Sequence, residues 1–150
     1  MITFSTLEQY LDLTYEYDQI TRLVRDFGRR WEWAELPADV GAGELRRCFP
    51  QARALAIAQP TRFTYVEGYA CNRTPCPIHH AWCVDERGFV VDPTWVVTEN
   101  ASYFGIAFEA EILRCTTVDF EGWGLLRTPM FSEKLIVTPE RYLQLGVFSG

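Results

Sequence analysis

Apolar residues recur at helical intervals in the first part of the chain. Residues 5–8, Ser-Thr-Leu-Glu, have the spacing of a capping box, which predicts a helix from about residue 6. Asp18 can cap a second helix or a continuation of the first. The apolar stripe that follows Asp18 consists of Ile20, Leu23, Val24, Phe27 and Trp31. We therefore expect the chain to begin with helices that bury one face.

A break and a third helical segment follow. Residues 36–43 contain one proline and two glycines, which interrupt the helical period and predict a loop. Residues 46–58 return to helical character, with small alanine side chains available for close packing. Pro60 is expected to end this helix.

The pattern then changes to that of strands. Residues 62–70 are dense in β-branched and aromatic side chains, and so are the two arms of residues 78–95. These segments predict three strands, two of which form a hairpin. Weaker patterns predict extended chain at 104–108 and 135–137, and a final helix over 138–146.

The turn of the hairpin decides which side chains share a face of the sheet. If residues 86–88 form a three-residue loop whose last residue, a glycine, is left-handed, His80 and Asp92 become diagonal neighbours on one face. An imidazole and a carboxylate can bridge that separation with a hydrogen bond. His79 and Cys83 then point to the opposite face. A two-residue loop would move Asp92 to the face away from His80.

Composition narrows the class of protein. The 150 residues are 48% hydrophobic and 15% aromatic, which predicts a single α+β domain over residues 1–150. A formal net charge of -6 makes nucleic acid an unfavourable partner. The first residues do not match the pattern of a signal peptide, and no stretch is apolar enough to span a bilayer. We therefore expect a soluble, cytoplasmic protein with no membrane partner. Five cysteines, an odd number, do not suggest a disulfide framework.

Cys48 has the position that a catalytic thiol requires. Pro50 marks the start of a helix, because proline is tolerated in the first helical turn but not deeper. Cys48 therefore lies in or beside that turn, where the helix dipole favours a thiolate. The alternative is that Cys48 packs in the core with Ala52 and Leu55, since free cysteine is often buried.

A second set of residues offers metal ligands. Cys71, Cys76, His79 and Cys83 form a C-x4-C-x2-H-x3-C series that could hold zinc. The spacing is less regular than that of paired C-x2-C knuckles. In the alternative interpretation, Cys71 and Cys76 lie in a loop and Cys83 packs inside the sheet.

The order of the motifs resembles a known family. The chain resembles the transglutaminase-like branch of the papain-like cysteine enzymes in the order of four motifs. These are a helix bearing Cys48, a strand ending in Gly68-Tyr69, the sequence His80-Ala-Trp, and the sequence Val-Asp92-Pro-Thr. Residues 44–108 also resemble small, largely uncharacterised bacterial and phage proteins. The resemblance implies a papain-like core with N-terminal helices packed on an antiparallel sheet. It further implies Cys48 as nucleophile, His80 as general base and acid, and Asp92 as the group that orients His80.

The same resemblance implies a cofactor-independent acyl transfer through a thioester. The substrate would be a protein, a peptide or another amide or ester. The acyl acceptor would be water, as in a peptidase, amidase or deamidase, or an amine, as in a transglutaminase. Gln51, Tyr65 and Trp82 are candidates for the oxyanion or substrate pocket. The family usually has glycine two residues before the cysteine, where this chain has Arg46. A zinc-stabilised binding module and a catalytically inactive papain-like interaction domain remain the alternatives.

Overall fold

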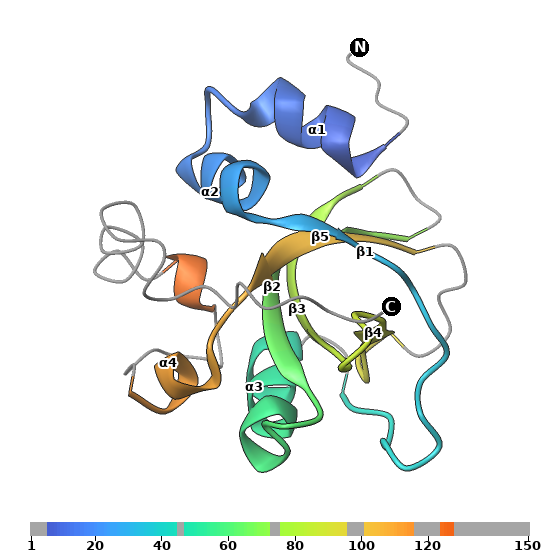
Figure 1. Cartoon of the computed structure of the whole chain (residues 1–150). Helices are drawn as coiled ribbons and strands as arrows, with labels where there is room; N and C mark the ends of the chain where they lie inside the picture. The colour runs from blue at the N-terminus through green and yellow to red at the C-terminus, as the bar shows by residue number, and fades with distance from the viewer. Residues whose placement is uncertain (1–5, 45–46, 73–75, 96–100, 116–123, 128–150) are drawn as a thin grey trace.

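The computed structural model describes residues 6–44, 47–72, 76–95, 101–115 and 124–127 (Figure 1). It is an α+β structure with a curled antiparallel sheet whose strand order is β1-β5-β2-β3-β4. The described elements are α1 (Leu7–Thr14), α2 (Gln19–Phe27), β1 (Arg29–Trp31), α3 (Cys48–Ala58), β2 (Thr64–Cys71), β3 (Ile78–Val84), β4 (Val90–Val91), β5 (Ser102–Ala107), α4 (Ala110–Cys115) and the short 3-10 helix η1 (Leu125–Arg127).

The first two helices form where the sequence predicts them, although α1 is capped by Thr6 and not by the first residue of the capping box, Ser5. The side chain of Thr6 accepts a hydrogen bond from the first turn of α1, and Asp18 does the same for α2. The expectation that the second helix continues to Trp31 is wrong, because Trp31 lies in β1. Gly28 is the reason, since a Cβ there would overlap the carbonyl of Gly105. Only a glycine lets the chain pass so close to β5 and enter the sheet.

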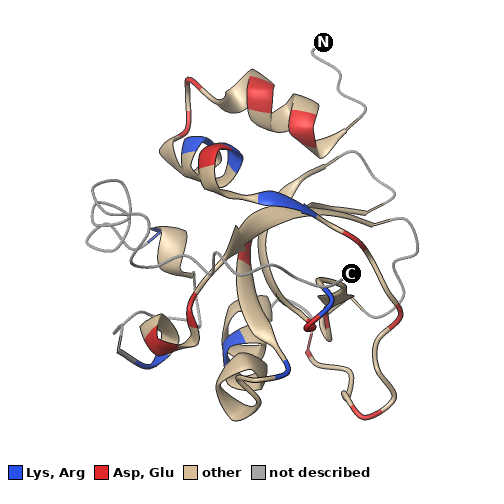
Figure 2. Ribbon diagram, in the orientation of Figure 1, with Lys and Arg blue, Asp and Glu red and all other residues tan. Residues whose placement is uncertain are grey.

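Ion pairs attach these helices to each other and to the sheet. Arg25 of α2 lies 2.8 Å from Asp12 of α1, and Arg30 of β1 lies 2.6 Å from Glu8. Figure 2 shows the acidic positions of α1 near the basic positions of α2 and β1. Exposed pairs of this kind contribute little stability individually, about 0–1 kcal/mol each. They connect α1 to α2 and to β1.

The hairpin has the three-residue loop on which the face assignment depends. The N–H of Gly88 donates to the carbonyl of Asp85 at 2.9 Å, and Asp85 pairs with Phe89. Gly88 has a φ of 88°, in the left-handed region that favours glycine. Cys83 then pairs with Val91, which is the predicted register. This prediction is confirmed.

Both faces of the sheet are covered. The thiol of Cys83 donates to the carbonyl of Ala52 at 3.2 Å, which shows how closely α3 packs on β3. Figure 1 shows α3 beside β2 and β3, while α1 and α2 lie near β5 and β1. The opposite face carries a second buried cluster of Trp31, Val66, Ala70, Trp82, Val84, Val90, Ala101, Tyr103 and Ala107.

Several boundaries differ from the sequence-based expectation. The third helix begins at Cys48 and the strand expected at 62–70 spans Thr64–Cys71, whereas α4 and η1 were not expected. The strand at 135–137 and the helix at 138–146 lie outside the described residues. None of the described helices has the length and apolar character needed to cross a bilayer.

Candidate active site

Three separate elements carry the residues of the expected triad. Cys48 is the first residue of α3, His80 lies in β3, and Asp92 directly follows β4. All three are buried: Cys48 is 8% exposed, His80 3% and Asp92 6%. Pro50 occupies the first turn of α3, where its missing N–H removes no helical hydrogen bond. The cysteine therefore lies at the N-terminal end of a helix, as the sequence predicts.

Asp92 is held by a complete set of donors. Its Oδ2 contacts Nε2 of His80 at 2.8 Å and accepts from the hydroxyl of Tyr103 at 2.9 Å. Its Oδ1 accepts from the backbone N–H and the hydroxyl of Thr94. Burial alone would raise the pKa of Asp92, but His80, Tyr103 and Thr94 together lower it. The carboxylate is thereby kept ionised beside the imidazole.

His80 is bound to this carboxylate, and its pKa is also influenced by the nearby Cys48 thiol. Because Nε2 is bound to Asp92, Nδ1 is the ring nitrogen available to Cys48. Burial acts to lower the pKa of His80, whereas the charge and hydrogen bond of Asp92, and then the hydrogen bond and charge of Cys48, raise it to about 9. His80 is therefore cationic at neutral pH. An imidazolium beside a thiol stabilises the thiolate.

Aromatic rings fix the plane of His80. The ring of Trp95 stacks on it with centroids 4.5 Å apart and an interplanar angle of 25°. Trp82 lies nearly parallel to the imidazole at 6.0 Å, and Tyr103 is at 6.4 Å. These contacts restrict rotation of the imidazole and exclude water from its hydrogen bond with Asp92.

The three pocket candidates lie in different surroundings. Gln51 is one turn after Cys48, and its amide donates to the carbonyl of Glu44 at 3.4 Å. Tyr65 is fully buried and its hydroxyl donates to Glu67 at 2.7 Å. Trp82 is also fully buried, within the core cluster against His80. Of the three, Gln51 is the one that follows Cys48 on the same helix.

The four residues of the alternative zinc site are engaged separately. Cys76 is exposed, and the thiol of Cys71 donates to a backbone carbonyl at 3.4 Å. Cys83 donates to Ala52, and burial raises the pKa of its thiol, which disfavours the thiolate that zinc binds. Both ring nitrogens of His79 have hydrogen-bond partners. Within the described parts of the chain, no three potential ligands are grouped around a metal position.

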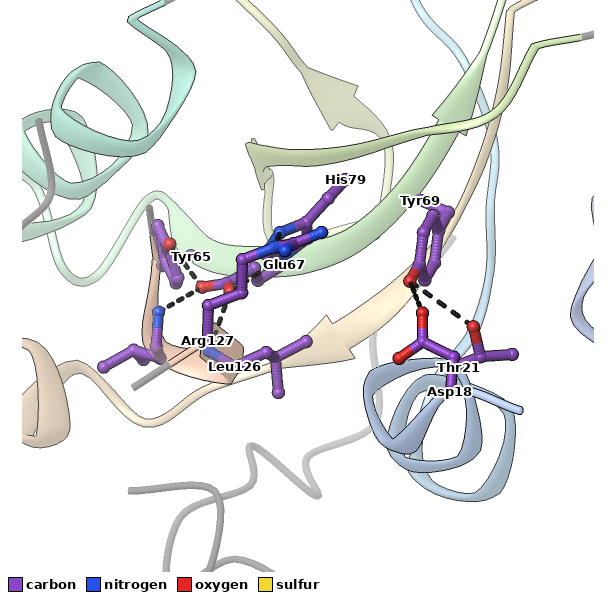
Figure 3. A network of polar contacts seen from close by, with 9 residues as sticks. Asp18, Thr21, Tyr65, Glu67, Tyr69, His79, Leu126 and Arg127 are labelled. Carbon is purple, nitrogen blue, oxygen red and sulfur yellow. Dashed lines mark hydrogen bonds and ion pairs between the residues drawn. The ribbon is translucent and has the colours of Figure 1, made fainter. Parts of the chain in front are cut away.

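A second buried carboxylate was missed by sequence reasoning. Glu67 lies in the middle of β2 and is fully buried. Its oxygens contact Nε2 of His79 at 3.0 Å and accept from the hydroxyl of Tyr65 and the backbone N–H groups of Leu125 and Leu126 (Figure 3). The signal was present in the sequence, because a single acid interrupts the otherwise uncharged strand Thr64–Cys71.

Comparison with known proteins does not assign this chain to a family. No protein-family model matches the chain. Neither a curated protein nor a solved structure gives a significant match. The geometry of the site is therefore the basis on which a function can be inferred for this chain.

Proposed function

We propose that this protein is a cysteine-dependent acyl-transfer enzyme with a papain-like core, and that Cys48, His80 and Asp92 are its catalytic triad. The observation that carries the proposal is the arrangement around His80. One side of the imidazole is bound to a saturated, buried carboxylate, and Cys48 at a helix N-terminus lies close enough to the imidazole to raise its pKa. This is the arrangement that activates a thiol as a nucleophile.

The reaction begins with attack of the Cys48 thiolate on an amide or ester carbonyl. The carbonyl π electrons move to oxygen and give a tetrahedral oxyanion. As the carbon–nitrogen or carbon–oxygen bond breaks, the imidazolium of His80 donates its proton to the leaving group. Neutral His80 then accepts a proton from water or an amine, which attacks the thioester and expels the Cys48 thiolate, so that the thiolate and the imidazolium are regenerated. Asp92 keeps the imidazole oriented throughout and stabilises its cationic form.

The start of α3 supplies donors for the oxyanion. The first N–H groups of a helix have no carbonyl partners within that helix and carry partial positive charge. The backbone N–H of Cys48 is one such group. Gln51 lies one turn later, and its side-chain amide is the second donor in this proposal, after release from the carbonyl of Glu44.

An activated ester tests the proposal without knowledge of the natural substrate. With p-nitrophenyl acetate, we expect a burst of nitrophenolate equal to the enzyme concentration and an acetyl group on Cys48. Peptide mass spectrometry locates the adduct, and added primary amines show whether an amine can replace water as the acceptor.

Two variants make this test specific. The burst should disappear in Cys48→Ala and persist in Cys76→Ala, which removes an exposed thiol. Acetylation that is spread over the other cysteines, or that leaves Cys48 unmodified, would contradict the proposed enzyme. That result would favour the inactive interaction domain.

A further inference from the structure

The guanidinium of Arg127 is hydrogen-bonded to His79, which is in turn hydrogen-bonded to the buried carboxylate of Glu67. Its Nε donates to Nδ1 of His79 at 2.8 Å. Because a guanidinium nitrogen can only donate, Nδ1 of His79 is the acceptor, and the neutral imidazole carries its proton on Nε2. That Nε2–H donates to the carboxylate of Glu67 at 3.0 Å (Figure 3). An exposed arginine is thus connected through one histidine to a fully buried acid.

The backbone that carries Arg127 is held by the same acid. The N–H groups of Leu125 and Leu126 each donate to Glu67 at 2.8 Å. Gly124 lies against this carboxylate, and a Cβ at residue 124 would overlap its oxygens. Both the main chain of η1 and the side chain of Arg127 are therefore fixed by contacts that begin at Glu67.

This attachment leaves the outer nitrogens of Arg127 available. The side chain is exposed, and the described residues provide no hydrogen-bond partner for Nη1 or Nη2. Two parallel N–H groups of a guanidinium match the two oxygens of a carboxylate. Because Nε is already held by His79, less side-chain freedom is lost when an anion binds. The arrangement is that of a prepared anion receptor.

Arg127 is linked to the catalytic thiol through two rings. The imidazole of His79 packs against the ring of Phe49, with centroids 5.0 Å apart. Phe49 directly follows Cys48 in the first turn of α3, so the His79 imidazole lies beside the start of the helix that carries the thiol, although it points to the face of the sheet opposite to His80. The anion receptor therefore belongs to the surroundings of the reactive cysteine.

We infer that Arg127 is a specificity-determining residue that binds a carboxylate near the reacting carbonyl of the acyl substrate, with His79 and Glu67 as its positioning residues. This inference rests on the proposed function. Binding of a carboxylate by Arg127 would make acidic acyl donors the preferred substrates, whereas the triad alone does not distinguish among amides and esters. The contact leaves the triad unchanged, so it alters preference among substrates and not the chemistry at Cys48.

Matched anionic and neutral alkylating reagents test this inference. Rates at Cys48 are measured for iodoacetate against iodoacetamide, and for N-iodoacetylglycine against N-iodoacetylglycinamide, whose charge lies farther from the reactive carbon. In Arg127→Ala, the ratio of anionic to neutral rates should fall about threefold for at least one pair, the size expected for one exposed charge-assisted contact. Arg127→Lys, which keeps the charge and loses the planar fork, should give an intermediate ratio.

The controls separate this inference from the proposed function. Arg114→Ala removes an exposed arginine of α4 that pairs with Glu111 at 3.8 Å, and it should leave the ratio unchanged. Neutral reagents should react with Cys48 at the wild-type rate in every arginine variant. If neutral labelling is intact and neither ratio changes in Arg127→Ala, the role of Arg127 is refuted while the triad stands. If neutral labelling of Cys48 does not depend on His80, the proposed function itself fails.

Discussion

Replacement of His80 by alanine is expected to slow alkylation of Cys48 by iodoacetamide at pH 6 by about 100-fold. In the native protein the pKa of His80 is raised to about 9, so at pH 6 it is an imidazolium, which in the proposed triad stabilises the Cys48 thiolate. A thiol without such a partner is only about 0.3% ionised at pH 6, and the thiolate is the reactive form. The rate is followed by peptide mass spectrometry of samples quenched over time.

The same samples contain an internal reference. Cys76 is exposed, so its alkylation should be equal in the native protein and in His80→Ala. His79→Gln provides the matched histidine variant, since His79 faces Glu67 and not Asp92. Equal labelling of Cys48 with and without His80 would mean that the thiol is not activated by this imidazole.

Replacement of Glu67 by alanine is expected to reduce the free energy of unfolding by at least about 3 kcal/mol, because it leaves several buried donors without an acceptor. The hydroxyl of Tyr65 and the N–H groups of Leu125 and Leu126 lose their partner, and so does His79. Glu67→Gln keeps one acceptor oxygen and should lose less. Urea denaturation measures both changes.

An exposed acid supplies the comparison for Glu67. Glu111 on α4 makes an i,i+3 pair with Arg114 and its side chain is 72% exposed. Glu111→Ala should therefore change the free energy of unfolding by no more than about 0.5 kcal/mol. Equal stability of the two alanine variants would show that the carboxylate of Glu67 does not hold η1 against β2.

Local rules predicted the parts of the site that depend on local geometry. Pro50 identifies the start of α3, because only the first helical turn accepts proline. The glycine of the turn, Gly88, fixes the hairpin register and so the shared face of His80 and Asp92. These inferences need only a few neighbouring residues. They succeeded because helix and hairpin geometry are set over short distances.

Contacts between distant segments could not be predicted in this way. The hydroxyl of Tyr103, in β5, donates a hydrogen bond to Asp92. The position of β5 between β1 and β2 cannot be inferred from the local sequence pattern of any one strand. Trp31 fits the helical stripe of the preceding residues, yet the close approach of Gly28 to β5 places it in a strand. The position of Arg127 depends on the buried carboxylate of Glu67, which holds the backbone of η1 and the His79 ring. Tertiary packing decided each of these cases.

The pH dependence of Cys48 alkylation by iodoacetamide tests whether Cys48 and His80 form a thiolate–imidazolium pair. The pKa of His80 is raised to about 9, and the proposed thiolate–imidazolium pair predicts a reaction rate that is high at pH 6 and nearly constant to pH 8. In Asp92→Asn the pKa of His80 should fall, because the charge and hydrogen bond of Asp92 raise it, and the rate at pH 8 should fall with it. A native rate that instead increases about tenfold per pH unit from 6 to 8, as for an isolated thiol, would contradict the catalytic triad.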